Sequence, residues 1–313
     1  MNETLYGTVP IIPTPFHDDE TVDEESLRRL IDFAAESGLK AVCLPAYASE
    51  FYKLTDEERL MVVRIAVEQA AGRLQIVAQS NHPSLRVAIQ LAKRNIEEGA
   101  SVISLAVPRI FGLPEASIRD YLSGFFSAIP DTPVLVQDFN PGGTTISVNL
   151  INELRLQHSN FKYLKLEEPL CAPKFEAIIQ ATEGAVHVFE GWGGLYILEL
   201  VPVGISGVMP GLAVADILQK IFTLRKSGED DKAFSLFEKV MPQIFFSLQN
   251  MELFHYAEKE LLTARGVLKN SVSRKAAYQP DASSMAYIRE LNKRILKVVE
   301  EMTQTAGSFA QLV

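Results

Sequence analysis

The chain has 313 residues, of which 47% are hydrophobic and 22% are charged, proportions that exclude a disordered or fibrous protein. Its formal net charge is −9 and no run of Lys or Arg stands out, so we expect no nucleic-acid partner, because phosphates require clustered cations. The apolar windows are too short or too interrupted by Gly and Pro to span a bilayer, and we see no signal peptide, so we expect no membrane partner.

A short apolar run followed by a longer amphipathic stretch recurs from residue 7 to about residue 226. The short runs are apolar almost throughout, which is typical of parallel strands buried on both faces. Eight strands are predicted in this way: Thr8–Ile12, Ala41–Leu44, Gln75–Gln79, Val102–Val107, Val134–Gln137, Tyr163–Leu166, Val186–Phe189 and Gly207–Met209. Helices are predicted between them, among others over Glu24–Glu36, Asp56–Ala70, Ser84–Glu98, Glu115–Ile129 and Leu212–Lys226.

Residues that begin and end helices support this alternation. Gly38, Gly72 and Gly99 each follow a helical window and precede a strand, where a glycine at the helix C-terminus belongs. Thr55 and Glu58 have the spacing of a capping box at the start of the second helix.

Eight βα units predict an α/β fold of the (β/α)8 TIM-barrel type over residues 1–226, with a doubly wound parallel sheet as the alternative. After residue 226 the strand pattern ends. A C-terminal three-helix extension is predicted over residues 227–313, with helices over Asp230–Leu248, Glu252–Arg265 and Ser284–Glu300.

Lys165 is the strongest candidate for chemistry, because the active site of a TIM barrel forms at the C-terminal ends of its strands. It ends the sixth predicted strand and follows Tyr163 by two residues, so we expect it to point into the barrel. Burial disfavours the charged form of a lysine amine and so favours a nucleophile. The alternative is a strand-end lysine that reaches solvent or pairs with Glu167 or Glu168.

Further motifs lie along nearly the whole chain: Gly7-x6-Thr14-Pro15-Phe16 with Asp23, Ser49-Glu50-x3-Leu54-Thr55, Val77-Ala78-Gln79, Pro133–Gln137, the strand that carries Lys165, Glu190-Gly191, Gly207-Val208 and Lys259-x5-Arg265-Gly266. Taken together, these motifs resemble the dihydrodipicolinate synthase/N-acetylneuraminate lyase family. The resemblance implies a mechanism without a cofactor, in which a lysine on strand six condenses with the ketone of pyruvate or a related 2-oxo acid. The resulting iminium would accept electrons during aldol cleavage, aldol addition or dehydration.

The resemblance also assigns roles to particular residues. Lys165 would be the Schiff-base lysine. The carboxylate of the 2-oxo acid would be held by the turn after strand two, here at Ala48 and Ser49. Gly191 and Val208, in the matching motifs of strands seven and eight, are further substrate-binding candidates. Family members are commonly tetramers, so a homo-oligomer, either a tetramer or a dimer, is implied.

Several positions depart from the family pattern. Gln137 stands 28 residues before Lys165, at the place of a proton-shuttling tyrosine, and an amide cannot replace that function. The turn Ala46–Glu50 lacks both threonines of the family, and Phe111 lies near the tyrosine that usually crosses from a neighbouring subunit. The arginine that follows strand five in the synthases is absent from residues 141–145. We therefore expect no true dihydrodipicolinate synthase activity.

Two residues are candidates to replace the missing acid–base group: Tyr47, at the first threonine position, and Asp138, next to Gln137. Tyr47 could instead pack over the pocket, and Asp138 could cap a loop. Gln137 would serve as a hydrogen-bonding group.

The sequence therefore predicts a Schiff-base lyase of a small 2-oxo acid, either a pyruvate-releasing aldolase or a 2-keto-3-deoxy sugar acid dehydratase. The alternative is a non-catalytic binding or sensor protein on the same fold, which the losses at Gln137 and Phe111 would permit. The five histidines form no H-x-H or H-E-x-x-H spacing, so no metal site is expected. Cys43 and Cys171 form no C-x-x-C motif, and a reducing, cytoplasmic setting is the simplest interpretation.

Overall fold

The computed structural model describes residues 4–109, 112–140, 145–275 and 278–310, with side chains up to residue 304. Within this part, eight parallel strands form one sheet in the order β1-β8-β7-β6-β5-β4-β3-β2. The strands are β1 (Gly7–Thr8), β2 (Ala41–Leu44), β3 (Gln75–Gln79), β4 (Val102–Ala106), β5 (Val134–Phe139), β6 (Phe161–Glu167), β7 (His187–Glu190) and β8 (Gly207–Val208). The predicted TIM barrel is confirmed, and the doubly wound alternative is excluded.

The sheet closes between the segment that follows β1 and the neighbouring strand β2. The Cys43 N–H donates to the Pro10 carbonyl at 2.9 Å, and the Ile12 N–H donates to the Cys43 carbonyl at 3.0 Å. The predicted strand Thr8–Ile12 is observed as the short β1 and an isolated bridge at Ile11. Pro10 has no N–H to donate to β2, so the ladder is interrupted there.

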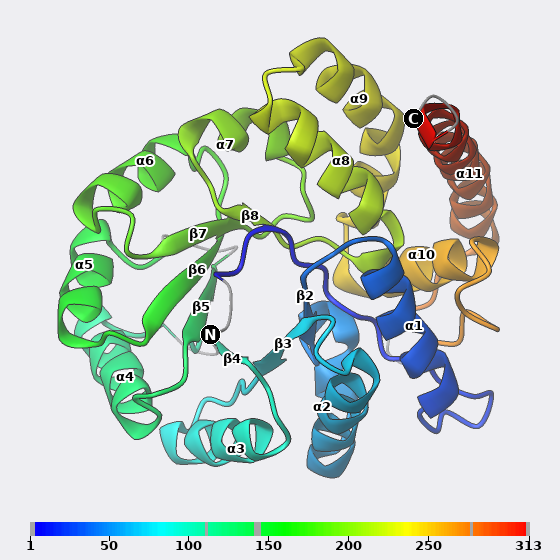
Figure 1. Ribbon diagram of the computed structural model, residues 1–313. Helices are drawn as coiled ribbons and strands as arrows, with labels where there is room; N and C mark the ends of the chain where they lie inside the picture. The colour runs from blue at the N-terminus through cyan, green and yellow to red at the C-terminus, as the bar shows by residue number, and fades with distance from the viewer. Residues whose placement is uncertain (1–3, 110–111, 141–144, 276–277, 311–313) are drawn as a thin grey trace.

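Eight helices surround the strands, one after each strand, as Figure 1 shows. They are α1 (Glu24–Glu36), α2 (Asp56–Ala70), α3 (Leu85–Glu97), α4 (Glu115–Ala128), α5 (Val148–Gln157), α6 (Ala172–Ala181), α7 (Ile197–Val203) and α8 (Ala215–Lys226). The predicted capping box is confirmed at the start of α2. The Thr55 hydroxyl accepts the Glu58 N–H, and the Glu58 carboxylate accepts the Thr55 N–H.

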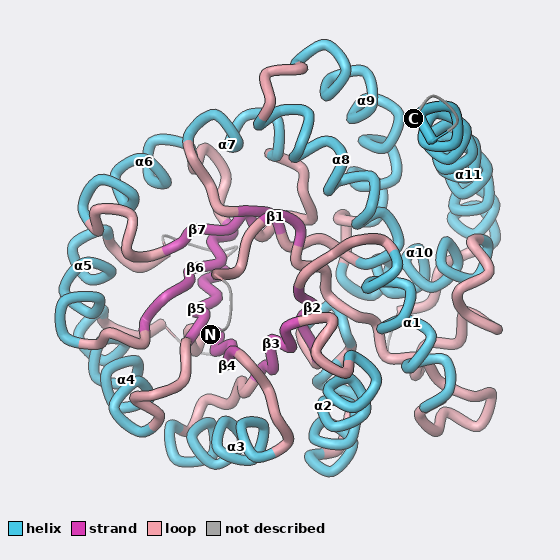
Figure 2. Tube along the Cα trace, in the orientation of Figure 1, coloured by secondary structure: helices cyan, strands magenta, loops and turns pink. Residues whose placement is uncertain are grey.

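Hydrophobic side chains fill the barrel on both faces of the strands. The layer between strands and helices forms the larger cluster, whereas a smaller cluster occupies the barrel interior and includes Cys43, Leu135, Tyr163 and Phe189. Figure 2 shows the strands in magenta at the centre and the helices in cyan outside them. Side chains alternate in direction along a strand. A strand residue two positions away from a member of the interior cluster therefore points into the barrel as well.

Three further helices follow the barrel: α9 (Asp230–Ser247), α10 (Met251–Ala264) and α11 (Ala282–Ala310). The predicted C-terminal helical extension is confirmed, and α11 packs against α9 and α10. Short 3-10 helices follow β2, as η1 (Tyr47–Ser49) and η2 (Phe51–Lys53), and β8, as η3 (Leu212–Val214). No helix in the described residues is long and apolar enough to cross a membrane.

Candidate active site

A cavity of about 470 Å³ opens at the C-terminal ends of the barrel strands. This volume lies within the range of small-molecule sites. The walls come from residues at or after the ends of β1, β2, β5, β6, β7 and β8, and from the turn between α9 and α10. Five of the residues predicted from the sequence line it: Tyr47, Ala48, Gln137, Lys165 and Gly191.

Strand β6 places an amine and a carboxylate next to each other in this cavity. Tyr163 points into the barrel interior, and Lys165 and Glu167 follow at intervals of two residues, so all three side chains share one face of β6. The Lys165 residue is 7% exposed, and its Nζ lies 3.0 Å from Glu167 Oε1. The lysine is thus buried at the base of the cavity and paired with a residue that also lines it.

Gln137 holds the carboxylate of Glu167 in place. It is the register partner of Lys165 on the adjacent strand β5. Its Nε2 donates to Glu167 Oε1 at 2.5 Å, and its Oε1 accepts from Gln79 Nε2 at 2.7 Å. A continuous chain of polar contacts therefore runs from Gln79 on β3 through Gln137 and Glu167 to Lys165. Gln137, which was predicted to act as a hydrogen-bonding group, therefore bonds to Glu167, the ion-pair partner of Lys165.

Gly191, directly after β7, leaves the space that the two charged side chains occupy. A Cβ at this position would lie 2.3 Å from Glu167 Cγ and 3.0 Å from Lys165 Cε. The Gly191 N–H donates to the Leu166 carbonyl at 3.1 Å, which fixes the backbone close to β6. The close approach, and not a special backbone angle, explains the glycine.

Tyr47 lines the cavity from η1, and its ring packs edge-on against Phe51 with centroids 5.0 Å apart. Burial, together with the negative charge of Glu167, raises the pKa of the Tyr47 phenol. The phenol is therefore a proton or hydrogen-bond donor at neutral pH and not a base. Within the described part of the chain, its hydroxyl makes no hydrogen bond.

The proposal that Asp138 replaces the missing tyrosine is not supported. Its neighbour Gln137 points into the barrel, so Asp138 points outward, and it does not line the cavity. Its carboxylate accepts from Arg109 Nη2 at 2.7 Å and from the Ile146 N–H at 2.6 Å. Burial raises the pKa of Asp138, whereas these two donors act in the opposite direction. The residue connects Arg109, after β4, to Ile146, before α5, and is no longer a candidate acid or base.

Two predicted substrate-binding residues also lie outside the cavity lining. The Ser49 N–H donates to the Ala46 carbonyl at 2.9 Å within the turn, and the Ser49 carbonyl accepts from Thr14 Oγ1 at 2.7 Å. Val208 packs in the layer between strands and helices, and Met209, the next residue, faces the cavity instead. Ala48 remains the substrate-binding candidate of the turn after β2. Phe111 lies outside the described residues.

The turn after β7 carries Trp192 into the cavity wall. The Glu190 carboxylate organises this turn by accepting the Trp192 N–H at 3.0 Å and the Gly194 N–H at 2.8 Å. Burial raises the pKa of Glu190 to about 7. Glu190 does not line the cavity, so its function is to position the turn.

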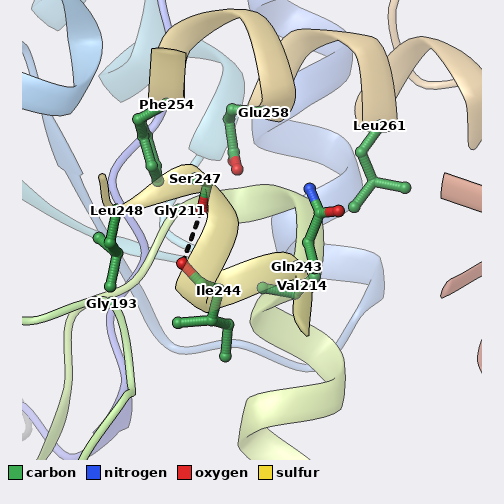
Figure 3. A pocket seen from close by; sticks show the side chains of 10 residues that line it. All are labelled: Gly193, Gly211, Val214, Gln243, Ile244, Ser247, Leu248, Phe254, Glu258 and Leu261. Carbon is green, nitrogen blue, oxygen red and sulfur yellow. Dashed lines mark hydrogen bonds between the residues drawn. The ribbon is translucent and has the colours of Figure 1, made fainter. Parts of the chain in front are cut away.

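The outer wall of the cavity comes from the C-terminal extension. A second, smaller cavity of about 20 Å³, with room for about one water, lies between the segment after β8 and helices α9 and α10. Figure 3 shows the side chains that line it. The Glu258 carboxylate from α10 borders it and accepts the Ala213 N–H at 2.7 Å. The two cavities are adjacent, because they share the lining residues Gly193, Gly211, Leu248 and Phe254.

Among the ion pairs that join this extension to the barrel, two involve residues of the C-terminal sequence motif. The buried Lys259 amine contacts the Glu50 carboxylate beside η1 and donates to the Val272 carbonyl at 3.0 Å. Arg265 donates to both carboxylate oxygens of Asp216 on α8, at 2.9 and 2.6 Å. The C-terminal sequence motif that contains Lys259 and Arg265 therefore fixes the outer wall of the cavity relative to its floor.

Sequence reasoning missed most of the outer wall. Phe139, Leu248, Met251 and Phe254 line the cavity, and they come from segments far apart in the chain. For Phe139 the signal was its place at the end of a barrel strand, two residues after Gln137. The extension carried no such signal, because its position depends on packing against the barrel. No group of three or more His, Cys, Asp or Glu that could hold a metal ion occurs among the described residues.

Residues 4–306 match the model of the Dihydrodipicolinate synthetase family. The chain belongs to this family. A curated member, the L-2-keto-3-deoxyarabonate dehydratase of Azospirillum brasilense, is 27% identical over 299 residues, which cover 93% of this chain and 96% of the relative. The predicted family is confirmed, and so is the prediction of a lyase-type enzyme.

Solved structures of other family members have the same fold. A dihydrodipicolinate synthase from Rhodopseudomonas palustris superposes with a TM-score of 0.86 at 27% identity, covering 92% of this chain and 97% of that one. An N-acetylneuraminate lyase from Fusobacterium nucleatum superposes with a TM-score of 0.82 at 19% identity, covering 93% and 98%. The low identities mark this chain as a divergent member of the Dihydrodipicolinate synthetase family.

Proposed function

We propose that the protein is a lyase in which Lys165 forms a Schiff base with a 2-oxo acid and Glu167 transfers the protons. The observation that carries this proposal is the buried amine of Lys165, 3.0 Å from the Glu167 carboxylate, at the base of a cavity large enough for a substrate. Glu167 thereby supplies the acid–base function for which Tyr47 and Asp138 were the candidates. Tyr47 remains as a donor to the substrate.

The paired geometry supports Schiff-base formation directly. Glu167 accepts a proton from the Lys165 ammonium, and the free amine adds to the C2 ketone. The ketone oxygen leaves as water after it takes up two protons that the ammonium held. The product is a protonated iminium, which keeps the positive charge beside the Glu167 carboxylate.

The same carboxylate serves both reactions that the sequence left open. In a dehydration, Glu167 removes a proton from C3 and passes it to the C4 hydroxyl, which the resulting enamine expels as water. In an aldol cleavage, Glu167 removes the proton of the C4 hydroxyl, the C3–C4 bond breaks, and its electrons pass to the iminium. The name of the Azospirillum relative, a 2-keto-3-deoxy acid dehydratase, supports dehydration.

Ala48 in η1 is the proposed contact for the substrate carboxylate, because it lines the cavity close to Tyr47. We retain Gly191 as a residue that shapes the site and not as a ligand contact. The division of the chain into a barrel (1–226) and an extension (227–313) agrees with α8 ending at Lys226 and α9 beginning at Asp230, and remains a proposal.

Two expectations about the cellular state also remain proposals. A homo-oligomer follows from the family, and a reducing, cytoplasmic setting agrees with Cys43 and Cys171, which are both buried free thiols.

Reductive trapping tests the proposed function. The protein is incubated with pyruvate and with several longer 2-oxo acids, reduced with borohydride, digested and analysed by mass spectrometry. We expect an adduct on Lys165 and none on the Lys165→Ala variant. Lys162→Ala, which changes an exposed lysine on the same strand, is the matched control and should still be trapped. A chain that stays unmodified with every 2-oxo acid contradicts the proposal.

A further inference from the structure

The cavity is much larger than its reactive end. Lys165, Glu167 and Gln137 occupy one end, and pyruvate alone is far smaller than a ligand that fills about 470 Å³. The remaining volume must accommodate the substrate beyond C3. Its walls therefore indicate the chemistry of that part of the substrate.

These walls are mainly apolar and partly aromatic. Ile11 and Met209 border the cavity from the segments after β1 and β8, and Leu248, Met251 and Phe254 border it from the extension. Phe139 and Trp192 stand on neighbouring sides, with their rings edge to face and centroids 6.5 Å apart. Apolar surface of this extent favours an apolar ligand group, because binding removes apolar surface of both from water.

Most polar side chains that line the cavity already have partners inside the protein. The Gln137 amide is engaged at both ends, by Gln79 and Glu167. Tyr52 donates to Glu252 and lies 3.0 Å from His255 Nε2.

One polar atom of each amide side chain in the α9–α10 turn is engaged as well. The Asn250 side chain caps α10 by accepting the Glu252 N–H at 2.8 Å, and Gln249 Nε2 donates to the Phe246 carbonyl at 3.2 Å. Among the described side chains of the wall, the Tyr47 hydroxyl, the buried Trp192 Nε1, Gln249 Oε1 and Asn250 Nδ2 are the polar groups without a partner inside the protein.

The charges of the cavity are also balanced. Among the described lining residues, Lys165 is the one cation and Glu167 the one carboxylate, and the two pair with each other. Among these described lining residues, a second carboxylate or a phosphate on the substrate would meet no further cation. A chain with several hydroxyls would lose water without gaining enough hydrogen bonds, which disfavours its binding.

We propose, building on the proposed function, that the substrate is a 4-hydroxy-2-oxo acid whose chain beyond C4 is apolar, with an aromatic ring as the best fit. The 2-oxo acid end meets Lys165, and the single C4 hydroxyl meets Glu167 and the Tyr47 hydroxyl. The ring lies between Trp192, Phe139 and the α9–α10 turn. The chemical steps are those of the proposed lyase and need no further reactant.

The test compares three substrates on the full-length protein: 4-hydroxy-2-oxo-4-phenylbutanoate, 4-hydroxy-2-oxopentanoate and L-2-keto-3-deoxyarabonate. Turnover is followed as pyruvate release and as formation of the unsaturated 2-oxo acid, so that both reaction types are detected. We expect kcat/KM for the phenyl substrate to exceed that for the sugar acid roughly 10- to 100-fold, because a ring is buried and no hydroxyl is left unpaired.

Substitutions in the cavity wall test whether its side chains cause the preference for the phenyl substrate. Trp192→Ala should reduce the ratio of kcat/KM for the phenyl substrate over the pentanoate roughly tenfold, mainly through KM. Met251→Ser changes a partly exposed residue of the rim and should reduce the same ratio by a smaller factor, with no risk to the core. Phe245→Ala, on the exposed face of α9 and outside the cavity lining, is the control and should leave the ratio unchanged.

The outcomes separate the two proposals. If pyruvate is trapped on Lys165 but the sugar acid has the higher kcat/KM, the apolar substrate class is wrong and the Schiff-base lyase stands. Equal effects of Trp192→Ala on the phenyl substrate and the pentanoate also refute the substrate class. If no 2-oxo acid is trapped and none is turned over, both proposals are wrong.

Discussion

The amine of Lys165 and the carboxylate of Glu167 are 3.0 Å apart, on the same face of the same strand. Their spacing of two residues along β6 places both side chains inside the barrel mouth. A single strand thus supplies a nucleophile and a proton acceptor, and Gln137 on the neighbouring strand β5 carries an amide that holds the acceptor in place.

Replacing Glu167 by Gln should separate binding from chemistry. The glutamine keeps the shape but cannot take a proton, so kcat should fall by about 10²- to 10⁴-fold while KM changes little. Slow formation of the pyruvate adduct on Lys165 should persist and remain visible by mass spectrometry. The control is Glu168→Gln, since Glu168 pairs with Lys174 at 3.0 Å and does not line the cavity. Equal activities of the two variants would contradict the assignment of Glu167.

Gln137→Leu should impair the enzyme through Glu167, because the carboxylate loses the donor that orients it. We expect kcat to fall about tenfold while KM changes little, because the carboxylate still lies beside Lys165 but is no longer held in position. A simple packing defect would lower the free energy of unfolding and leave kcat of the folded enzyme unchanged. Steady-state kinetics and urea unfolding of the same preparation are therefore the deciding measurements.

Gly191→Ala should disturb the site more than the fold. The added methyl group would overlap Glu167 and push Lys165, because a Cβ there lies 2.3 Å from Glu167 Cγ. We expect a loss of activity of at least about 100-fold, with a stability loss of about 1–3 kcal/mol, typical of overpacking. Activity and urea unfolding of the same preparation test this. Full activity in the alanine variant would show that Glu167 is not needed where the structure places it.

The buried Glu258 should make stability depend on pH. Burial raises its pKa to about 7 in the folded state, above the ordinary value of 4.5. Between these values the folded protein holds a proton that the unfolded chain releases, so this residue's contribution to stability falls as the pH rises from about 4.5 to about 7.

Glu258→Gln mimics the protonated form and removes this dependence. The free energy of unfolding of the variant, minus that of the wild type, should therefore increase by up to about 3 kcal/mol across the same pH range. Urea unfolding of both proteins at a series of pH values measures it. A difference that does not change with pH would contradict the shifted ionisation.

The barrel was predictable because its strands are continuous apolar runs, and the place of Lys165 followed from its spacing to Tyr163. The same spacing rule separates Gln137 from Asp138, since adjacent residues on a strand point to opposite faces, and applying it there would have removed Asp138 as a candidate acid or base. Local pattern therefore predicts which side chains enter the barrel.

The contacts that each side chain makes were harder to predict from the sequence than the direction in which it points. The pairing of Lys165 with Glu167 was one of several alternatives until the geometry showed that the pair lies inside the cavity. The outer wall depends on contacts between distant segments, such as Leu248 and Phe254 of the extension near Trp192 of the barrel. Such contacts arise from the packing of whole helices, for which the sequence offers no short-range pattern.

A crystal structure of the protein soaked with pyruvate tests the central claim most directly. The account predicts continuous electron density between Lys165 Nζ and C2 of the ligand, with the Glu167 carboxylate within hydrogen-bond distance of the new iminium. Pyruvate bound without a covalent bond, or a ligand far from an unmodified Lys165, would contradict it.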